Sequence, residues 1–114
     1  MVRRLMQAGK IYTMNYGFEP PELGKKYRPA LVMFVDSDAS LAYVCKITKS
    51  KPNRDFPYRE QILHKDFAKL HYDSYVQYNW FDTVPITARH KYMGTLHTSD
   101  FGRIFGRFKS FHGL

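Results

Sequence analysis

Two residues at the ends of neighbouring apolar segments carry side chains that can bind a phosphate group. Arg28 precedes the apolar run PALVMFV, and Thr48 ends the segment LAYVCKIT. A guanidinium group donates to two oxygens of one phosphate, and a hydroxyl group adds another hydrogen bond. Such donors stabilise the charge that grows on non-bridging oxygens during phosphoryl transfer. A structural role stays open, in which Thr48 is a plain strand residue. Arg28 would then pair with the carboxylate of Glu22 or Asp36.

Further polar side chains are expected near these two. Lys46 shares a strand face with Thr48, because side chains two residues apart point to the same side of a strand, and it would add a second cation. By the same alternation, Gln77 and Asn79 share a face of the later segment YVQYNWF.

Other chemistries find little support. The five histidines, His64, His71, His90, His97 and His112, show no metal-binding spacing, and Cys45 is the only cysteine. We therefore predict no metal site and no cofactor. A two-histidine acid–base site stays open, since sequence cannot bring any two of them together. Phosphate-binding loops and hydrolase elbows are absent from the sequence. Cys45 is interpreted as a core residue, and Asp36 and Asp38 as turn formers.

Composition and charge narrow the class of protein. The chain has 114 residues, of which 44% are apolar and 17% aromatic, which predicts one folded domain over residues 1–114. The net charge of +8 favours a polyanionic partner. No apolar stretch is long enough to span a membrane, and residues 1–10 do not resemble a secretion signal. We expect a cytoplasmic protein.

The apolar patterns predict five to seven short strands. Residues 29–35 are continuously apolar and predict a central strand buried on both faces. In residues 41–48, odd-numbered and even-numbered side chains should occupy opposite faces. Further strands are predicted within residues 9–18, 61–63, 75–81, 83–87 and 90–96, and residues 49–60 form a basic, proline-containing loop.

Two helical segments are also predicted. Phe101, Ile104, Phe105, Phe108 and Phe111 recur at three- and four-residue steps, which indicates an amphipathic C-terminal helix capped by Thr98, Ser99 or Asp100. Gly102 and Gly106 should lie on its outer face. Residues 64–74 favour a turn of helix with Phe67 and Leu70 pointing inward. The predicted fold is mainly β: a small antiparallel barrel with a C-terminal helix.

The order of these segments resembles the MazF/PemK toxin family. The likeness includes GKIYTMNY, RPALVMF, YVCKITKS, SYVQYNW with TVPIT, and GTLHTSDFGRIFGRF, from about Gly9 to Phe108. The resemblance implies an SH3-like β-barrel with a C-terminal helix, usually a homodimer. It also implies metal-independent cleavage of single-stranded RNA and neutralisation by an antitoxin protein, which the charge of +8 predicts to be acidic.

The resemblance also implies roles for individual residues. Arg28 matches the family's active-site arginine and Thr48 its strand-end threonine, so these two are the predicted catalytic residues. A second group is assigned to RNA binding: Lys46, Ser50, Gln77, Asn79 and Glu22. Ser50 stands in for a serine that often follows the threonine, and Glu22 for a loop glutamate. Gln77 and Asn79 occupy positions where some members have an arginine and an aspartate.

Three functional hypotheses follow. The first is a toxin-like endoribonuclease, in which the RNA's own 2′-hydroxyl attacks the phosphorus and exposed aromatics such as Tyr78 or Trp80 stack on bases. The second is a non-catalytic RNA- or protein-binding module of the same fold, which Gln77 and Asn79 favour. The third is a gyrase poison, an activity that occurs on this architecture.

Overall fold

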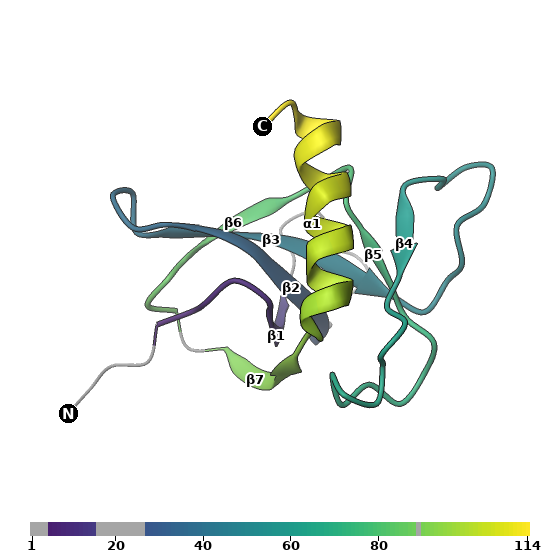
Figure 1. Cartoon of the computed structure of the whole chain (residues 1–114). Coiled ribbons are helices and arrows are strands. Elements are labelled where there is room, and N and C mark those ends of the chain that lie inside the picture. Colours follow the sequence, from purple (N-terminus) through teal and green to yellow (C-terminus); the bar gives the residue numbers. More distant parts are fainter. Residues whose placement is uncertain (1–4, 16–26, 89) are drawn as a thin grey trace.

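The computed structural model describes residues 5–15, 27–88 and 90–114. These residues form seven strands and one helix (Figure 1). In chain order they are β1 (Lys10–Asn15), β2 (Tyr27–Asp36), β3 (Leu41–Thr48), β4 (Arg59–Gln61), β5 (Tyr75–Gln77), β6 (Asp82–Pro85), β7 (Lys91–Thr95) and α1 (Thr98–His112).

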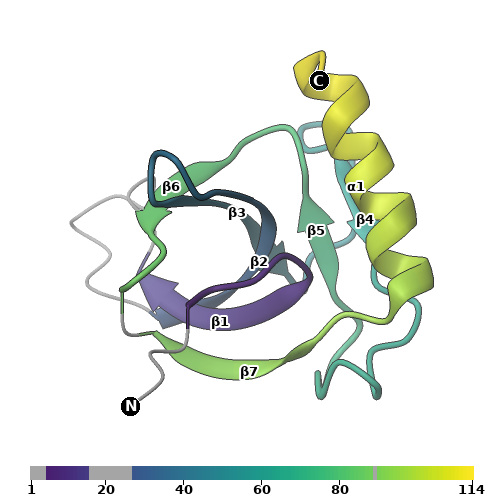
Figure 2. The ribbon, with the colours of Figure 1, turned by 60° about the vertical axis from the view of Figure 1, so that its left-hand side comes forward.

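The strands form one curved antiparallel sheet. Its order is β4–β5–β3–β2–β1–β7, and β6 pairs with the first half of β3. Register shifts in β1 and β2 mark bulges, which bend strands and increase their twist. Figure 2 shows the sheet curling round, with α1 standing beside β4 and β5. The predicted antiparallel β fold with a C-terminal helix is confirmed. Among the described residues, however, the end strands β4 and β7 do not pair, so the sheet is not a closed barrel.

Both faces of the central strands are packed. From β3, Cys45 and Ile47 join a core that includes Ile104 and Phe108 of α1. Val44 points the other way, into a second core that contains Met6 and Ile86. The predicted two-faced alternation of β3 is therefore confirmed.

The central run of β2 is buried on both faces, but over a shorter length than predicted. Leu31 and Met33 belong to the core under α1, and Ala30 and Val32 belong to the opposite core. The prediction that the whole run is buried is wrong at Phe34, because 45% of its surface is exposed. The register shift between Val32 and Phe34 turns this side chain out of the regular alternation.

The C-terminal helix packs one stripe against the sheet. Its buried residues are Asp100, Ile104 and Phe108, which are spaced four apart. Gly102 and Gly106 lie on the outer face as predicted, since an added Cβ would meet no atom within 4 Å. Two details differ from the prediction. The N-cap is His97, whose ring accepts the Ser99 N–H, and Phe111 is 45% exposed.

Residues 64–74 contain one turn of the helical type, in which the Ala68 N–H donates to the His64 carbonyl oxygen at 3.2 Å, but no regular helix. The segment is a series of turns in which Lys69 has a φ of 61°, a left-handed conformation that interrupts a right-handed helix. Phe67 is 59% exposed, so its predicted inward position is wrong, whereas Leu70 is buried as predicted. The turn packs tightly on β7, where a Cβ on Gly94 would overlap the carbonyl oxygen of Ala68.

The remaining strands differ from their predicted lengths. The first strand has the six residues expected, and β7 lies inside its predicted range. β6 covers Asp82–Pro85, so it begins one residue before the predicted range of 83–87 and ends two residues earlier. The strand predicted at 61–63 runs instead over Arg59–Gln61. The strand predicted at 75–81 ends at Gln77, after which the chain turns. No helix in the described part of the chain is long and apolar enough to cross a membrane.

Candidate RNA-binding site

Arg28 and Thr48 belong to the same end of the sheet. The β2–β3 ladder ends at the pair Ala30 and Lys46, and continuing its register by two residues sets Arg28 opposite Thr48. On the other side of β3, Thr48 pairs with Tyr75, which pairs in turn with Gln61 of β4. The site residues therefore begin a row that runs across four strands, each about 4.8 Å from the next.

One of the two structural partners considered for Arg28 lies too far away. Asp36 is at the opposite end of β2, roughly 25 Å along the strand at the usual rise per residue. Its carboxylate accepts a hydrogen bond from the Ala39 N–H at 3.1 Å, which confirms its predicted role in the turn. The other partner considered, Glu22, lies outside the described residues.

The backbone after β3 fixes the Thr48 side chain. The Ser50 N–H donates a hydrogen bond of 3.2 Å to Thr48 Oγ1. This local turn occupies one lone pair of the oxygen and leaves the hydroxyl proton available to a ligand. Thr48 and Lys46 are both half-buried, and Ser50 is exposed.

Gln77 and Asn79 are not the pair that the sequence predicted. Gln77 Oε1 accepts a hydrogen bond from Arg59 Nε at 3.1 Å, between residues that face each other across β4 and β5. Burial lowers the pKa of Arg59 from its ordinary value, but an arginine side chain remains charged near neutrality. Asn79 lies in the turn after β5, so the two amides do not share a strand face, and its buried Oδ1 accepts no hydrogen bond from the described residues.

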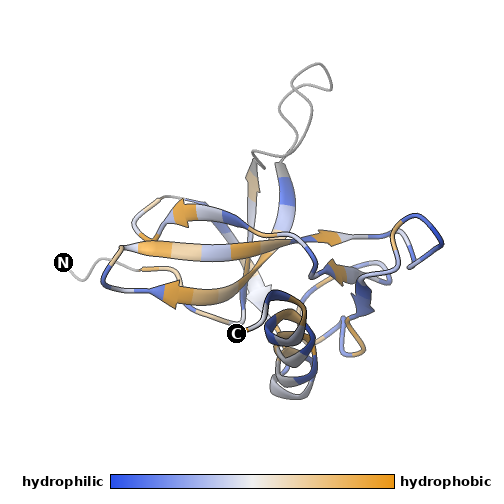
Figure 3. Ribbon diagram, turned by 90° about the horizontal axis from the view of Figure 1, so that it is seen from above, coloured by the Kyte–Doolittle hydropathy of each residue, from blue (hydrophilic) through white to orange (hydrophobic). Residues whose placement is uncertain are grey.

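The loop after Thr48 combines exposed cations and aromatic rings. Residues 49–58 are exposed and connect β3 to β4, and Figure 3 shows their hydrophilic colours on the right-hand side. Lys49 Nζ lies 4.2 Å from the ring centre of Tyr72, and the Arg59 guanidinium lies 4.4 Å from that of Phe56. In a single-stranded nucleic acid, such cationic groups can bind the phosphates and such exposed aromatic rings can stack on the bases.

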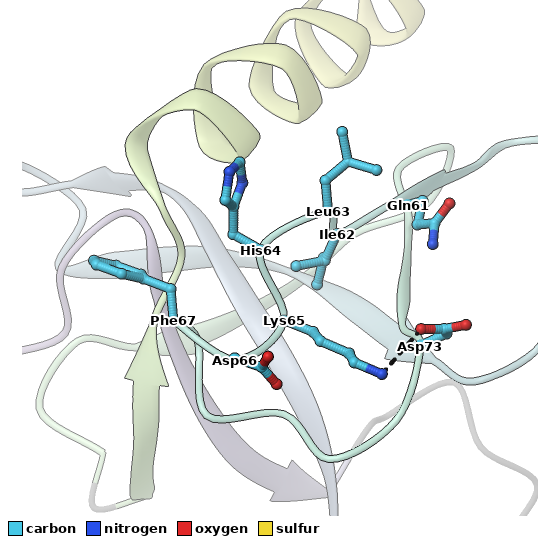
Figure 4. A pocket seen from close by; sticks show the side chains of 8 residues that line it. All are labelled: Gln61, Ile62, Leu63, His64, Lys65, Asp66, Phe67 and Asp73. Atoms are coloured by element: carbon cyan, nitrogen blue, oxygen red, sulfur yellow. Dashed lines mark hydrogen bonds and ion pairs between the residues drawn. The ribbon is translucent and has the colours of Figure 1, made fainter.

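Two adjoining depressions extend from this loop. The larger, of about 550 Å³, is lined by residues that include Lys51, Arg59 and Tyr75. The smaller, of about 290 Å³, is shown in Figure 4 and is lined by residues 61–67 and Asp73. Gln61 and Asp73 line both, so the two depressions lie side by side. In the smaller one, Lys65 Nζ lies 3.1 Å from the Asp73 carboxylate.

His64, which lines the smaller depression, contacts a buried carboxylate that the sequence analysis considered only as a helix cap. Asp100 is 1% exposed and accepts hydrogen bonds from the backbone N–H of His64 (2.8 Å) and the guanidinium of Arg103 (2.9 Å). His64 Nδ1 lies 3.2 Å from the same carboxylate. Burial alone would raise the pKa of Asp100, but hydrogen bonds from His64, Arg103 and Leu63 outweigh it and hold the pKa below its ordinary value.

Arg103 extends this network to β4. Its guanidinium also donates to Glu60 Oε1 at 2.8 Å and to the carbonyl oxygen of Gln61 at 2.7 Å. The sequence contains a signal for the buried carboxylate, because Asp100 occupies the apolar stripe of Ile104 and Phe108. A charged residue on a buried stripe requires partners.

Two of the five histidines are brought together. The rings of His64 and His97 stack with centres 4.2 Å apart and an interplanar angle of 18°. His112 lies at the other end of α1, where its Nε2 is 2.9 Å from the carbonyl oxygen of Tyr78. Among the described residues, no group of three His, Cys, Asp or Glu side chains is arranged to hold a metal ion.

The predicted stacking residues have different environments. Trp80 is 57% exposed. Tyr78 is half-buried, and its ring lies 5.9 Å from Tyr58 and 6.3 Å from Phe111. Of these two, Trp80 presents the more accessible face.

Comparison with models of known protein families shows to which family the chain belongs. The sequence model described as "PemK-like, MazF-like toxin of type II toxin-antitoxin system" matches residues 7–112. The chain belongs to this family. A comparison of this sequence with curated proteins found no match.

Solved structures share the fold. MazF from Deinococcus radiodurans superposes with a TM-score of 0.71 at 16% identity, covering 97% of this chain and 99% of that one. A MazE–MazF complex from the same organism gives 0.70 at 17% identity, with 97% and 99% coverage. An endoribonuclease in complex with its cognate antitoxin, from Mycobacterial species, gives 0.70 at 14% identity, with 94% of both chains covered. At these identities the likeness establishes the MazF-like fold.

Proposed function

We propose that this MazF-like chain is a metal-independent endoribonuclease that cleaves single-stranded RNA in the cytoplasm and is neutralised by a cognate antitoxin. Family membership over residues 7–112 supports a toxin. The observation that supports the nuclease proposal is the register of β2 and β3, which pairs Ala30 with Lys46 and, when continued by two residues, puts Arg28 opposite Thr48.

In the proposed reaction, the 2′-hydroxyl of the RNA attacks the adjacent phosphorus. Its proton passes to solvent, and the 5′-oxygen of the next nucleotide leaves and takes up a proton from solvent. The products are a 2′,3′-cyclic phosphate and a 5′-hydroxyl end. The Arg28 guanidinium stabilises the charged phosphorane, and the Thr48 hydroxyl, held by the Ser50 N–H, positions a phosphate oxygen. Lys46 supplies a further positive charge on the face of Thr48.

The loop of residues 49–58 is proposed to guide the RNA strand. Lys49 and Arg59 lie beside the exposed rings of Tyr72 and Phe56. Bases of a single strand stack on such rings, while the cations meet its phosphates. Gln77 orients Arg59 in this arrangement and is therefore a positioning residue.

The cleavage test uses single-stranded RNA in the presence of a metal chelator. The expected products carry 2′,3′-cyclic phosphate and 5′-hydroxyl ends, identified by mass spectrometry. Cleavage that stops when metal is removed, or products with 5′-phosphate ends, would contradict the proposed chemistry.

A second candidate function is an RNA-binding module that does not cleave. It is favoured by Gln77, whose amide is occupied by Arg59 and supplies no acid–base group. A labelled RNA that is retarded in a gel and never shortened would decide for this function. A gyrase poison would instead leave cellular RNA whole, and a topoisomerase mutation would relieve its toxicity.

The proposed protein partners are an acidic antitoxin and a second copy of the chain. The net charge of +8 favours an acidic partner, and similar structures are described as complexes with antitoxins. A small acidic protein encoded beside this chain should bind it and suppress cleavage at equimolar amounts. Light scattering should give twice the mass of the 13.5 kDa chain.

A further inference from the structure

We propose that His64 and His97 form a second phosphate-binding subsite, which takes a backbone phosphate of the same RNA strand away from Arg28 and Thr48. The inference rests on the proposed RNA substrate. It follows from the hydrogen bonds of the two stacked rings, which leave their Nε2 atoms available.

The contacts of His97 make its Nε2 a hydrogen-bond donor. Its Nδ1 accepts the Ser99 N–H at 3.1 Å and lies 2.8 Å from the Ser99 hydroxyl. A neutral imidazole that accepts at Nδ1 carries its proton on Nε2. His97 therefore presents an N–H group at the N-terminus of α1, where the helix dipole also favours an anion.

The contacts of His64 prepare it to carry a positive charge. Its Nδ1 donates to the Asp100 carboxylate, whose lowered pKa keeps it ionised near neutrality. The imidazolium form of this ring donates from both nitrogens, to the buried carboxylate through Nδ1 and to a phosphate through Nε2. The ring is accessible to a ligand, since 48% of the side chain is exposed.

In the described part of the chain, neither Nε2 atom makes a hydrogen bond. Stacking at 4.2 Å keeps both rings within reach of one small anion. Phe67 packs edge-on against His97, with ring centres 5.0 Å apart, and limits the rotation of that ring.

The subsite is connected to the proposed cleavage site. His64 lines the smaller depression, which shares Gln61 and Asp73 with the larger one. The larger depression reaches Tyr75, the β5 partner of Thr48. An RNA strand with one phosphate at Thr48 can therefore continue past Tyr75 and Gln61, so that a later phosphate reaches His64. This path favours RNA over a separate acidic protein as the occupant.

Charged groups lie around His64 on several elements. Asp100 and Arg103 face it from α1, and His97 faces it from the turn that precedes the helix. The loop contributes a further set of charges: Lys65, Asp66 and Asp73. Of these, Lys65 and Asp73 form an ion pair with each other.

The test measures binding without cleavage. A 2′-O-methyl oligonucleotide of about eight nucleotides cannot be cut through its 2′-hydroxyl and is long enough to span such a path. Its affinity is measured over a range of salt concentrations with the wild type, His64→Gln, His97→Asn and the control His71→Gln. His97→Asn retains a residue that caps helices well, and His64→Gln retains the backbone N–H bonded to Asp100. His71 is an exposed residue of the same loop.

Each expected result depends on loss of a phosphate contact. His64→Gln should weaken binding about five- to tenfold and lower the slope of log affinity against log salt by about 0.7. His97→Asn should weaken binding about threefold, as for loss of one neutral hydrogen bond, and His71→Gln should change nothing. The imidazole NMR signals of His64 and His97 should shift on addition of the oligonucleotide.

Two results would overturn the inference. One is unchanged affinity and salt slope in His64→Gln. The other is an oligonucleotide that binds without shifting the two histidine signals, whether or not an acidic protein shifts them. Cleavage of unmodified RNA by the same wild-type sample is assayed in parallel, so failure of the subsite is distinguished from failure of the nuclease proposal.

Discussion

Asp100, in the first turn of α1, accepts a hydrogen bond of 2.8 Å from the backbone N–H of His64, 36 residues earlier in the chain. Arg103 completes the contact by bridging Asp100 to Glu60. The turn after β4 and the start of the helix are thus joined through one buried carboxylate.

Asp100→Asn should destabilise the fold by about 3 kcal/mol, because it leaves the half-buried guanidinium of Arg103 with one ionic partner fewer. Urea denaturation followed by circular dichroism measures the change. Asp66→Asn is the matched control, since Asp66 is an exposed residue of the loop. Equal stability of the two variants would contradict a stabilising role for the buried network.

The same carboxylate predicts a sensitivity to acid. The folded-state pKa of Asp100 lies below its ordinary value, so its contribution to stability is present above about pH 4. That contribution is lost as pH falls through the lowered folded-state pKa. Denaturation between pH 5 and pH 2 should show a smaller pH-dependent loss in Asp100→Asn than in the wild type. If both proteins lose the same stability between pH 5 and pH 2, another group controls the acid sensitivity.

Cys45 should be inert while the protein is folded. Its thiol is buried in the core under α1 and lies 3.3 Å from the carbonyl oxygen of Trp80. Burial raises its pKa well above the ordinary value, so almost no thiolate forms at neutral pH. Iodoacetamide should label the native protein negligibly and the urea-unfolded protein fully, as measured by mass spectrometry. Rapid labelling of native protein would contradict the assigned burial.

The basic loop should determine much of the salt dependence of RNA binding. Replacing Lys49, Lys51 and Arg54 together with alanine should lower the slope of log affinity against log salt by about 2, at about 0.7 per lost phosphate contact. Arg107 and Lys109, exposed on α1, provide a control variant that also removes positive charge. If both variants reduce the slope equally per charge removed, the RNA does not follow the loop.

The strands and the terminal helix were predictable because their signals are local. The alternation in β3 and the phenylalanine spacing in α1 each indicate which side chains are buried. The helical turn within residues 64–74 is not continued, for a local reason that the sequence does not display: Lys69 adopts a left-handed conformation that ordinary side chains seldom take.

The sites were predictable in part. Arg28 and Thr48 could be proposed because both stand at ends of strongly apolar segments, and the observed register places those ends together. The His64–Asp100 contact could not be derived, because it joins distant parts of the chain through the packing of α1. Gln77 and Asn79 were predicted to share a strand face, but strand pairing ends at Gln77.

The most direct test of the nuclease proposal is the cleavage rate of Arg28→Ala. With single-stranded RNA in chelator, this variant should lose about 10²- to 10³-fold in rate, as expected when a donor to the developing charge is removed. Arg107→Ala, which removes an exposed arginine from α1, should cleave at the wild-type rate. Wild-type cleavage by a folded Arg28→Ala variant would contradict the assignment of Arg28 to the reacting phosphate.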